Sequence, residues 1–316
     1  MWPNSRPLVY LLWVLVLGGC HVAQVSGETD ANSKVSSVGS DTLSGIMTRW
    51  SELYRDRFPE VIMQIQASGS STAPPALIEG TASLGPMSRR MNRSEIRRFR
   101  ASYGYDPTEI VVGFDAIAVF VNHENPIQAL TLVQLDSLFS GTNRCGGVSS
   151  SETWRDLGVT TSLGAHKVSL FGRNSASGTY TFFREKALCG GDFRKRVNEQ
   201  PGSSSVVQSV GVSPRGIGYS GIGYVNESVK VLALISERGE PVFPSAGSAL
   251  QGTYPLARPL YIYVNQPSDQ VLTGREKQFL ELALSPAGQQ VITDYGFIAL
   301  PESLRLRVRA QLGIDS

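Results

Sequence analysis

Hydrophobic and polar residues follow two different periods in the N-terminal part of the chain. Apolar residues recur at helical spacing from Leu43 to Tyr54, directly after Ser40-Asp41-Thr42, which are good N-cap residues. This pattern predicts a helix that ends before Pro59. Residues Val61–Gln66 then alternate as a strand does, and the pair Pro74-Pro75 marks the start of another helix.

Two long apolar runs stand out from the rest, Ile110–Val121 and Leu260–Val264, and both are typical of fully buried strands. Short apolar runs alternate with amphipathic stretches from Val35 onward, which predicts an α/β fold. These two runs divide the chain into a first, a middle and a last segment. The last segment is too short to form a domain alone, so the first and last segments must combine to reach the usual size of a domain. We therefore expect a discontinuous lobe 1 of residues 38–115 and 258–316, and a lobe 2 of residues 116–257, joined by two strands that can act as a hinge.

Length and charge narrow the class of protein. A chain of 316 residues suits two domains, and its net charge of +2 gives no electrostatic case for binding nucleic acid. Arginines do cluster between Arg89 and Arg100, but Phe99 is the single aromatic residue among them. A solvated helix face explains most of this cluster.

The N-terminus resembles a signal peptide. Arg6 precedes the apolar run Leu8–Leu17, which is too short for a permanent transmembrane helix, and small residues lead to Cys20. We expect residues 1–20 to be an export signal with a lipobox cysteine, the alternative being an uncleaved anchor or a chance cysteine. Residues 21–37 are polar and predict a flexible tether. The protein would then be exported to the periplasm or cell surface and held on the membrane by lipid on Cys20 alone.

Two cysteines remain once Cys20 is assigned to a lipid. Cys145 and Cys189 both lie in sequences that read as glycine-flanked loops. An exported protein with an even pair predicts one disulfide between them. Two free thiols or a metal site are the alternatives, and lone cysteines without nearby histidines make a poor metal site. We expect no metal and no cofactor.

Three segments place Ser, Thr and Gly at the start of expected helices: Gly39–Thr42, Gly69–Thr72 and Ser177–Thr179. Free N–H groups and the positive end of the helix dipole make such a start suitable for an anion. One such segment alone is more often a simple cap. Arg173 precedes the last segment by a few residues, and its guanidinium can pair with two oxyanion oxygens.

The order of these motifs resembles the substrate-binding proteins of the phosphate-specific ABC transporter, the PstS-type periplasmic binding proteins. The resemblance extends from Val38 to about Leu300, with Arg173-x-x-x-Ser177-Gly178-Thr179 as its most specific part, and it includes Phe279–Ile292 and Tyr295–Pro301. It implies a type II periplasmic binding fold, with two α/β lobes and a ligand cleft between them. It also implies a monomer that binds inorganic phosphate and delivers it to an ABC transporter permease.

The resemblance also implies a set of ligand residues. Thr42 and the backbone of Leu43 would donate from the first helix start, and Ser70 from the second. Four residues would contact the anion from the other lobe: Arg173, Ser177, Gly178 and Thr179.

One position departs from the family pattern. Ser88 stands where a family member has an aspartate that accepts the proton of phosphate, and Arg89 follows it as a further candidate ligand. A hydroxyl both donates and accepts, so it does not repel a fully deprotonated oxyanion. Ser175 replaces the acidic partner of the motif arginine, which leaves Arg173 to pair with the ligand, Asp41 or Asp115.

Other functions have weaker support in the sequence than phosphate binding has. The segment Gly216–Gly221 matches G-x-G-x-x-G but lacks the strand before it and the helix after it, so we expect a glycine-rich strand edge there. The alternatives that stay open are a binding protein for sulfate or molybdate, a secreted phosphatase and a surface interaction protein. The phosphatase lacks an evident metal cluster or nucleophile–base pair, and we expect no enzyme.

Overall fold

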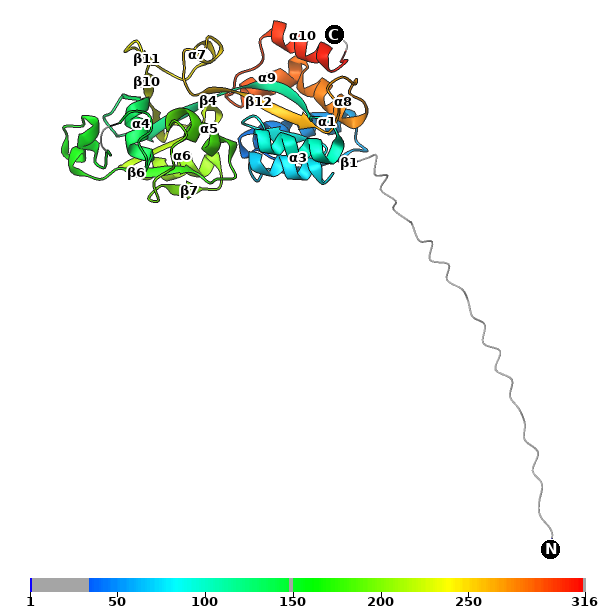
Figure 1. Ribbon diagram of the computed structural model, residues 1–316, viewed down its shortest axis with the longest axis horizontal. Helices are drawn as coiled ribbons and strands as arrows, with labels where there is room; N and C mark the ends of the chain where they lie inside the picture. Colours follow the sequence, from blue (N-terminus) through cyan, green and yellow to red (C-terminus); the bar gives the residue numbers. More distant parts are fainter. Residues whose placement is uncertain (2–33, 148–149, 315–316) are drawn as a thin grey trace. The chain divides into compact units, whose positions relative to one another are not determined.

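The computed structural model of the protein describes Met1 and residues 34–147 and 150–314 (Figure 1). Its α-helices are α1 (Ser44–Arg57), α2 (Ala73–Ile78), α3 (Arg93–Tyr103), α4 (Leu132–Phe139), α5 (Gly178–Ala187), α6 (Ser203–Gly211), α7 (Ala246–Leu250), α8 (Gly274–Ala283), α9 (Pro286–Asp294) and α10 (Glu302–Gln311). Short 3-10 helices are η2 (Asp41–Leu43), η3 (Ser70–Thr72), η4 (Trp154–Leu157), η5 (Ser162–Ala165) and η6 (Ile222–Tyr224).

The strands form three sheets. They are β1 (Lys34–Val38), β2 (Ile62–Gln66), β3 (Gly85–Met87), β4 (Thr108–Asn122), β5 (Ala129–Thr131), β6 (Ser169–Arg173), β7 (Asn198–Gln200), β8 (Gly216–Gly221), β9 (Val229–Val231), β10 (Ala233–Ile235), β11 (Pro241–Val242) and β12 (Ala257–Val264). The largest sheet has the order β3-β12-β4-β8-β6-β7, and β9 also pairs with β4. β1 and β2 pair in parallel, and β5, β10 and β11 form the third sheet.

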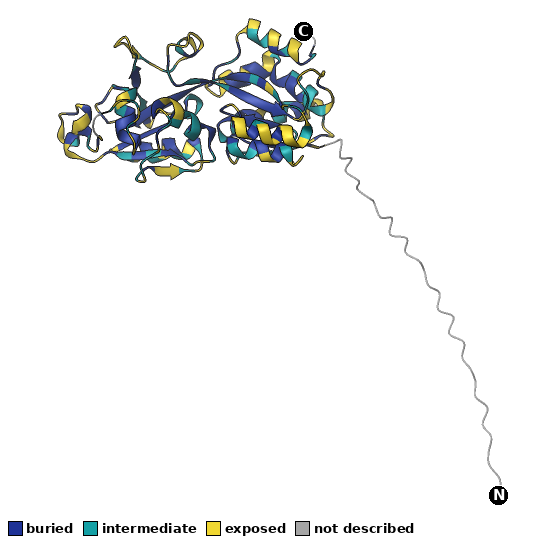
Figure 2. Cartoon of the chain, in the orientation of Figure 1, coloured by how far each residue is buried: buried dark blue, intermediate teal, exposed yellow. Residues whose placement is uncertain are grey.

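Strand β4 belongs to both halves of the structure. Its first part, from Thr108 to Ala116, pairs with β12, and its second part, from Ile117 onward, pairs with β8 and β9. Val112 packs in one hydrophobic core with Trp50 and Phe279, whereas Val119 packs in another with Trp154. Figure 1 shows β4 and β12 running between the two groups of elements, and Figure 2 shows buried residues inside each group. The mixed α/β fold expected from the sequence is confirmed.

Several predicted elements are also confirmed. Helix α1 ends at Arg57, two residues before Pro59, although a turn of 3-10 helix, η2, precedes it. Strand β2 occupies Ile62–Gln66, and α2 carries prolines in its first turn. The two long apolar runs are β4 and β12. Helix α3 turns Arg97, Arg98 and Arg100 to solvent, as a solvated face requires.

Two expectations need correction. Lys34–Val38 is strand β1 with Val35 fully buried, so the tether expected at residues 21–37 does not reach residue 37. The reason is parallel pairing with β2, which a short polar stretch does not reveal. Gly216–Gly221 is a strand, but it lies between β4 and β6 and is buried along its length, so it is not an edge. The expected signal peptide and Cys20 lie outside the described residues.

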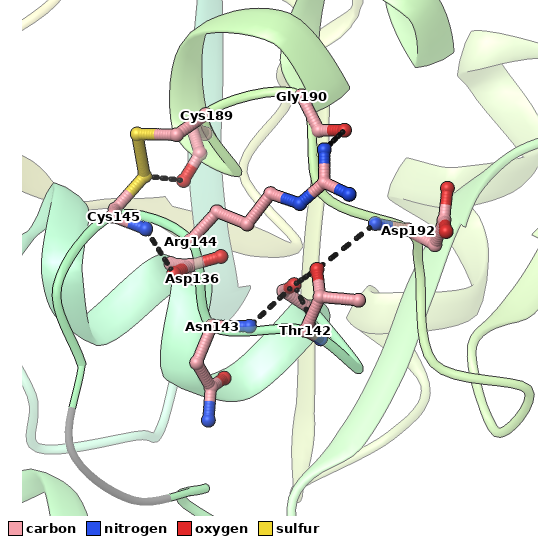
Figure 3. The surroundings of a disulfide bond; sticks show 10 residues. Asp136, Thr142, Asn143, Arg144, Cys145, Cys189, Gly190 and Asp192 are labelled. Carbon is pink, nitrogen blue, oxygen red and sulfur yellow. Dashed lines mark hydrogen bonds between the residues drawn. A yellow bond between two sulfur atoms is a disulfide. The ribbon is translucent and has the colours of Figure 1, made fainter.

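The predicted disulfide between Cys145 and Cys189 is confirmed. It joins the loop after α4 to the loop after α5 (Figure 3). The Cys145 N–H donates to Asp136 at 2.7 Å, and Arg144 donates to the Gly190 carbonyl at 3.2 Å. The covalent bond therefore belongs to a small network that fixes two loops to each other.

Candidate functional site

The structure brings together residues far apart in the sequence at the starts of α1 and α5. Thr42 Oγ1 and Thr179 Oγ1 lie 3.1 Å apart, although 137 residues separate them in the chain. Both side chains are buried. Thr42 lies just before α1, which packs in the hydrophobic core that contains Trp50. Thr179 lies in the first turn of α5, which packs in the core that contains Trp154. The two expected halves of the site therefore meet directly.

Ser70, Ser88 and Gly178 form a second contact of the same kind. The Ser70 and Ser88 hydroxyl oxygens are 3.2 Å apart, and the Ser88 N–H donates to Ser70 Oγ at 3.0 Å. A Cβ atom added to Gly178 would lie 2.4 Å from Ser70 Oγ and 2.6 Å from Ser88 Oγ. Glycine is therefore needed at Gly178 because the backbone of α5 approaches both serines so closely.

Ser177 is the N-cap of α5. Its hydroxyl oxygen accepts the N–H groups of Thr179, at 3.1 Å, and Tyr180, at 3.4 Å. This leaves the hydroxyl proton of Ser177 to donate elsewhere. The N–H of Gly178, at the first position of α5, has no partner within the helix. The start of α5 thus offers donors next to Thr42, Ser70 and Ser88.

Arg173, at the end of β6, is buried and bonded on several sides. Its guanidinium lies 3.0 Å from the Asp41 carboxylate and donates to Ser203 Oγ at 2.6 Å and to the Pro201 carbonyl at 2.9 Å. Among the described residues, Nε of Arg173 has no hydrogen-bond partner. Burial lowers the pKa of Arg173, and the Asp41 carboxylate opposes that shift. Of the two carboxylates expected as partners of this arginine, Asp41 forms the ion pair, whereas Asp115 pairs with Arg258.

Arg258, at the start of β12, was missed by the sequence reasoning. It is 1 % exposed, and its Nε and Nη2 donate to Asp115 Oδ2 at 3.0 and 2.7 Å. Nη2 also donates to Thr179 Oγ1 at 2.8 Å. A pattern could have indicated this pair: Asp115 is the one charged residue in the run Ile110–Val121, and Arg258 precedes the other apolar run. Two buried strands that each carry one opposite charge favour pairing.

Two candidate ligand residues are already engaged. Arg89 is bound in a bidentate way by Glu95, at 2.8 and 2.7 Å, and donates to Ser71 at 3.1 Å. This ion pair turns Arg89 toward the start of α3, so the structure gives no support to its expected contact with a ligand. The Leu43 N–H donates to the Ser40 carbonyl at 3.3 Å, a long bond within η2.

The arrangement suits recognition of a small anion with several oxygens. Hydroxyl groups and guanidinium N–H groups are donors, and a tetrahedral oxyanion presents acceptors in several directions. Both carboxylates that lie near these donors, Asp41 and Asp115, are ion-paired. The structure, within its described ranges, contains no group of three or more His, Cys, Asp or Glu residues that could hold a metal ion.

Known proteins with similar sequences or structures point to one family. The profile of the PBP superfamily domain matches residues 24–287. The phosphate-binding protein PstS of Pseudomonas aeruginosa is 53% identical over 284 residues, which are 90% of this chain and 88% of that protein.

Solved structures share the fold. A substrate-binding protein assigned to a phosphate ABC transporter of Clostridium perfringens, with bound phosphate, aligns with a TM-score of 0.71 at 24% identity, over 85% of this chain and 100% of that chain. An ABC-type phosphate transport receptor of Vibrio cholerae aligns with a TM-score of 0.66 at 24% identity, over 84% and 100%. The chain therefore belongs to the PBP superfamily and, within it, to the family of the phosphate-binding protein PstS.

Proposed function

We propose that this protein binds inorganic phosphate and delivers it to an ABC-type importer. The observation that carries the proposal is the meeting of buried hydroxyl donors from both cores, Thr42 and Thr179. Thr42 follows Asp41, whose carboxylate lies 3.0 Å from the Arg173 guanidinium. The name of the Pseudomonas aeruginosa relative, at 53% identity, supports the same ligand. Ser70, Ser177 and Gly178 complete the proposed set of ligand residues, and Ser88 joins it through its contact with Ser70.

Binding closes two lobes in this proposal. Lobe 1 comprises residues 38–115 and 258–316, lobe 2 comprises residues 116–257, and β4 and β12 connect them. Support comes from the two cores and from contacts between them, such as the Asp41–Arg173 ion pair at 3.0 Å and the Ser71 N–H to Ala176 carbonyl bond at 3.1 Å. An anion that accepts hydrogen bonds from both lobes stabilises the closed state, because those bonds are complete only there.

The protein acts by binding rather than by turnover. A hydrolase would need a base to activate a nucleophile, and the two carboxylates nearest the hydroxyl cluster are neutralised: Asp41 pairs with Arg173 and Asp115 with Arg258. Thr42 Oγ1 lies 3.1 Å from Thr179 Oγ1, which also accepts from Arg258 Nη2, so the recorded partners of these two hydroxyls include no histidine. These contacts suit a receptor that holds an unchanged anion.

Ser88 favours a second candidate ligand class. Its side chain is a buried hydroxyl where a family member has a carboxylate, so a fully deprotonated anion such as sulfate or molybdate meets no negative charge from this position. Isothermal titration of protein stripped of bound ligand tests both candidates. Phosphate should bind more tightly than sulfate or molybdate, by a small margin because Ser88 does not repel the two other anions. Tighter binding of sulfate would reassign the ligand, and heat from none of the three anions would leave a surface interaction protein as the function.

Export and lipid attachment complete the proposal. The sequence before residue 21 has the order of a signal peptide with Cys20 at its end, and a monomer would stay on the membrane through that lipid. Mass spectrometry of the protein extracted from membranes should find the lipid on Cys20. Cys20→Ala should release the protein into the soluble fraction, and retention on membranes without lipid would support an uncleaved anchor instead.

A further inference from the structure

Resting on the proposed phosphate function, we infer that Arg258 is a second guanidinium that contacts the bound anion through its Nη1 atom and makes the site selective for doubly charged oxyanions. Arg258 comes from β12, whereas the other proposed ligand residues come from helix starts, from Ser88 after β3 and, for Arg173, from the end of β6. Four observations about its contacts lead to this assignment.

The first observation is the way in which the guanidinium is oriented. Asp115 Oδ2 accepts from Nε and Nη2, and its other oxygen accepts the Ile222 N–H at 3.1 Å. The carboxylate is therefore fixed on both oxygens and holds one edge of the planar guanidinium. Nη1 is the one guanidinium nitrogen that does not donate to Asp115, so it can donate to another acceptor.

The second observation is that Nη1 is buried without a partner in the part of the chain that the structure describes. A buried donor without an acceptor costs free energy of folding. A role in the ion pair alone therefore does not explain why Nη1 is buried. A buried ion pair is also a poor means of stabilising a fold when compared with apolar side chains of similar volume. An anion supplies the acceptor that Nη1 lacks.

The third observation is the position of this orphan donor relative to the proposed ligand residues. Nη2, on the same planar group, donates to Thr179 Oγ1, which lies 3.1 Å from Thr42 Oγ1. Nε of Arg173 is the corresponding unused donor on the other guanidinium. The positive charge of Arg173 contributes to lowering the pKa of Arg258, after the larger effect of burial, so the two guanidinium groups interact.

The fourth observation is the chemistry of the whole set. Asp41 and Asp115 each neutralise one arginine, and the neighbouring side chains of Ser70 and Ser88 are hydroxyls. In the part of the chain that the structure describes, both carboxylates recorded near this cluster are therefore ion-paired and not free to accept a proton from a singly charged phosphate, whereas two guanidinium groups can donate to oxygen lone pairs. This balance favours the dianion of phosphate over the monoanion, and it weakens discrimination against sulfate.

The test compares phosphate affinity in a variant that removes the whole buried pair, Arg258→Met with Asp115→Asn. The asparagine keeps an acceptor for the Ile222 N–H, and no charge is left uncompensated. We expect cooperative melting, a phosphate Kd raised by at least about tenfold, and a flatter dependence of Kd on pH between about pH 6 and about pH 8. We also expect sulfate to compete less well than with the wild type.

Arg275→Met is the matched control. Arg275 also pairs with a carboxylate, that of Glu60 at 2.9 Å, and its guanidinium lies 5.7 Å from the Phe58 ring, much as Arg258 lies 5.6 Å from Phe182. The recorded partners of Arg275 include none of the proposed ligand residues. The phosphate Kd of the Arg275→Met variant and the pH dependence of that Kd should therefore match those of the wild type.

The outcomes separate this inference from the proposed function. A wild type that binds no phosphate contradicts the proposed function itself. A wild type that binds, with an equally tight and equally pH-dependent double variant, contradicts only the role of Arg258. Should the double variant not fold, a crystal structure of the wild type with phosphate decides: Nη1 within about 2.7–3.2 Å of a phosphate oxygen supports the role, and any longer separation overturns it.

Discussion

The Asp41 carboxylate lies 3.0 Å from the Arg173 guanidinium and also accepts the Ser203 N–H at 3.0 Å. Asp41 belongs to η2, before α1, whereas Arg173 and Ser203 lie at β6 and α6. One carboxylate on the first half of the structure therefore holds the charged group that we assign to the ligand on the second half. In the proposed function, ligand recognition and closure of the lobes therefore depend on the same arginine.

Truncation of the proposed ligand residues should weaken phosphate binding. Arg173→Ala removes a charged donor and Ser177→Ala removes a hydroxyl at the start of α5, so each should raise the Kd by at least about tenfold, equivalent to about 1.4 kcal/mol. Isothermal titration with stripped protein measures the change. Thermal melting should show that Ser177→Ala remains folded, and unchanged affinity in both variants would reject the site assignment.

Gly178→Ala tests how closely the two halves approach. The added methyl group would lie 2.4 Å from Ser70 Oγ, so the serine or α5 must move, and phosphate binding should be lost or weakened by more than about tenfold. Gly247→Ala is the control, because its methyl group would meet nothing closer than 3.9 Å. Wild-type affinity in Gly178→Ala would mean that this approach is not part of the binding state.

The disulfide should stabilise the second core. Cys145 and Cys189 enclose a segment with a sequence separation of 44, and closing a loop of this size typically contributes roughly 2–4 kcal/mol. Replacing both cysteines by serine should lower the free energy of unfolding by this amount in denaturant titrations. Reductant should destabilise the wild type and leave the variant unchanged. Equal stability of the oxidised wild type and the variant would contradict the prediction.

Local sequence patterns predicted those parts of the site that depend on short segments. Thr42, Ser70 and Ser177 were predicted to stand at helix starts, and they do, because a few local residues determine where a helix begins. The ion pair of Arg89 was not predicted, because the position of Arg89 beside Ser88 is local, whereas its partner Glu95 is presented by the capping box of α3.

The long-range partners could not be predicted in the same way. Arg258 meets Asp115 only because β12 and β4 pair antiparallel with these two residues in register, 143 positions apart in the chain. Ser203 reaches Asp41 across 162 positions. Periodicity predicts that these strands and helices exist, but it does not fix which residues of distant elements face one another.

Tyr224 should make stability sensitive to alkaline pH. Its hydroxyl donates to the Asp41 carbonyl at 2.8 Å, and burial raises the pKa of Tyr224 to about 12. Since the pKa in the folded state exceeds the ordinary value of 10.0, this contribution is complete below about pH 10 and is lost as the pH rises toward about 12.

Denaturant titrations of the wild type and Tyr224→Phe measure this contribution. The phenylalanine variant should be less stable at neutral pH, because the Asp41 carbonyl loses its donor, and the difference should shrink by roughly 1–3 kcal/mol between about pH 10 and about pH 12. Other buried tyrosines titrate in both proteins and cancel in the comparison. A stability difference that stays constant over this range would contradict the role of Tyr224.

Removal of the Asp41 carboxylate should shift the unliganded protein toward an open form. Asp41→Ala deletes the ion pair with Arg173 and the bonds to the Ser203 N–H and hydroxyl, at 3.0 and 3.1 Å, and these join the two halves. Without phosphate, small-angle scattering should give a larger radius of gyration for the variant than for the wild type. Saturating phosphate should reduce the difference, because the anion supplies its own bonds to both lobes.

Asp56→Ala, an exposed position on α1, is the control and should scatter as the wild type does. Superimposable curves for unliganded Asp41→Ala and wild type would show that this carboxylate does not hold the lobes together.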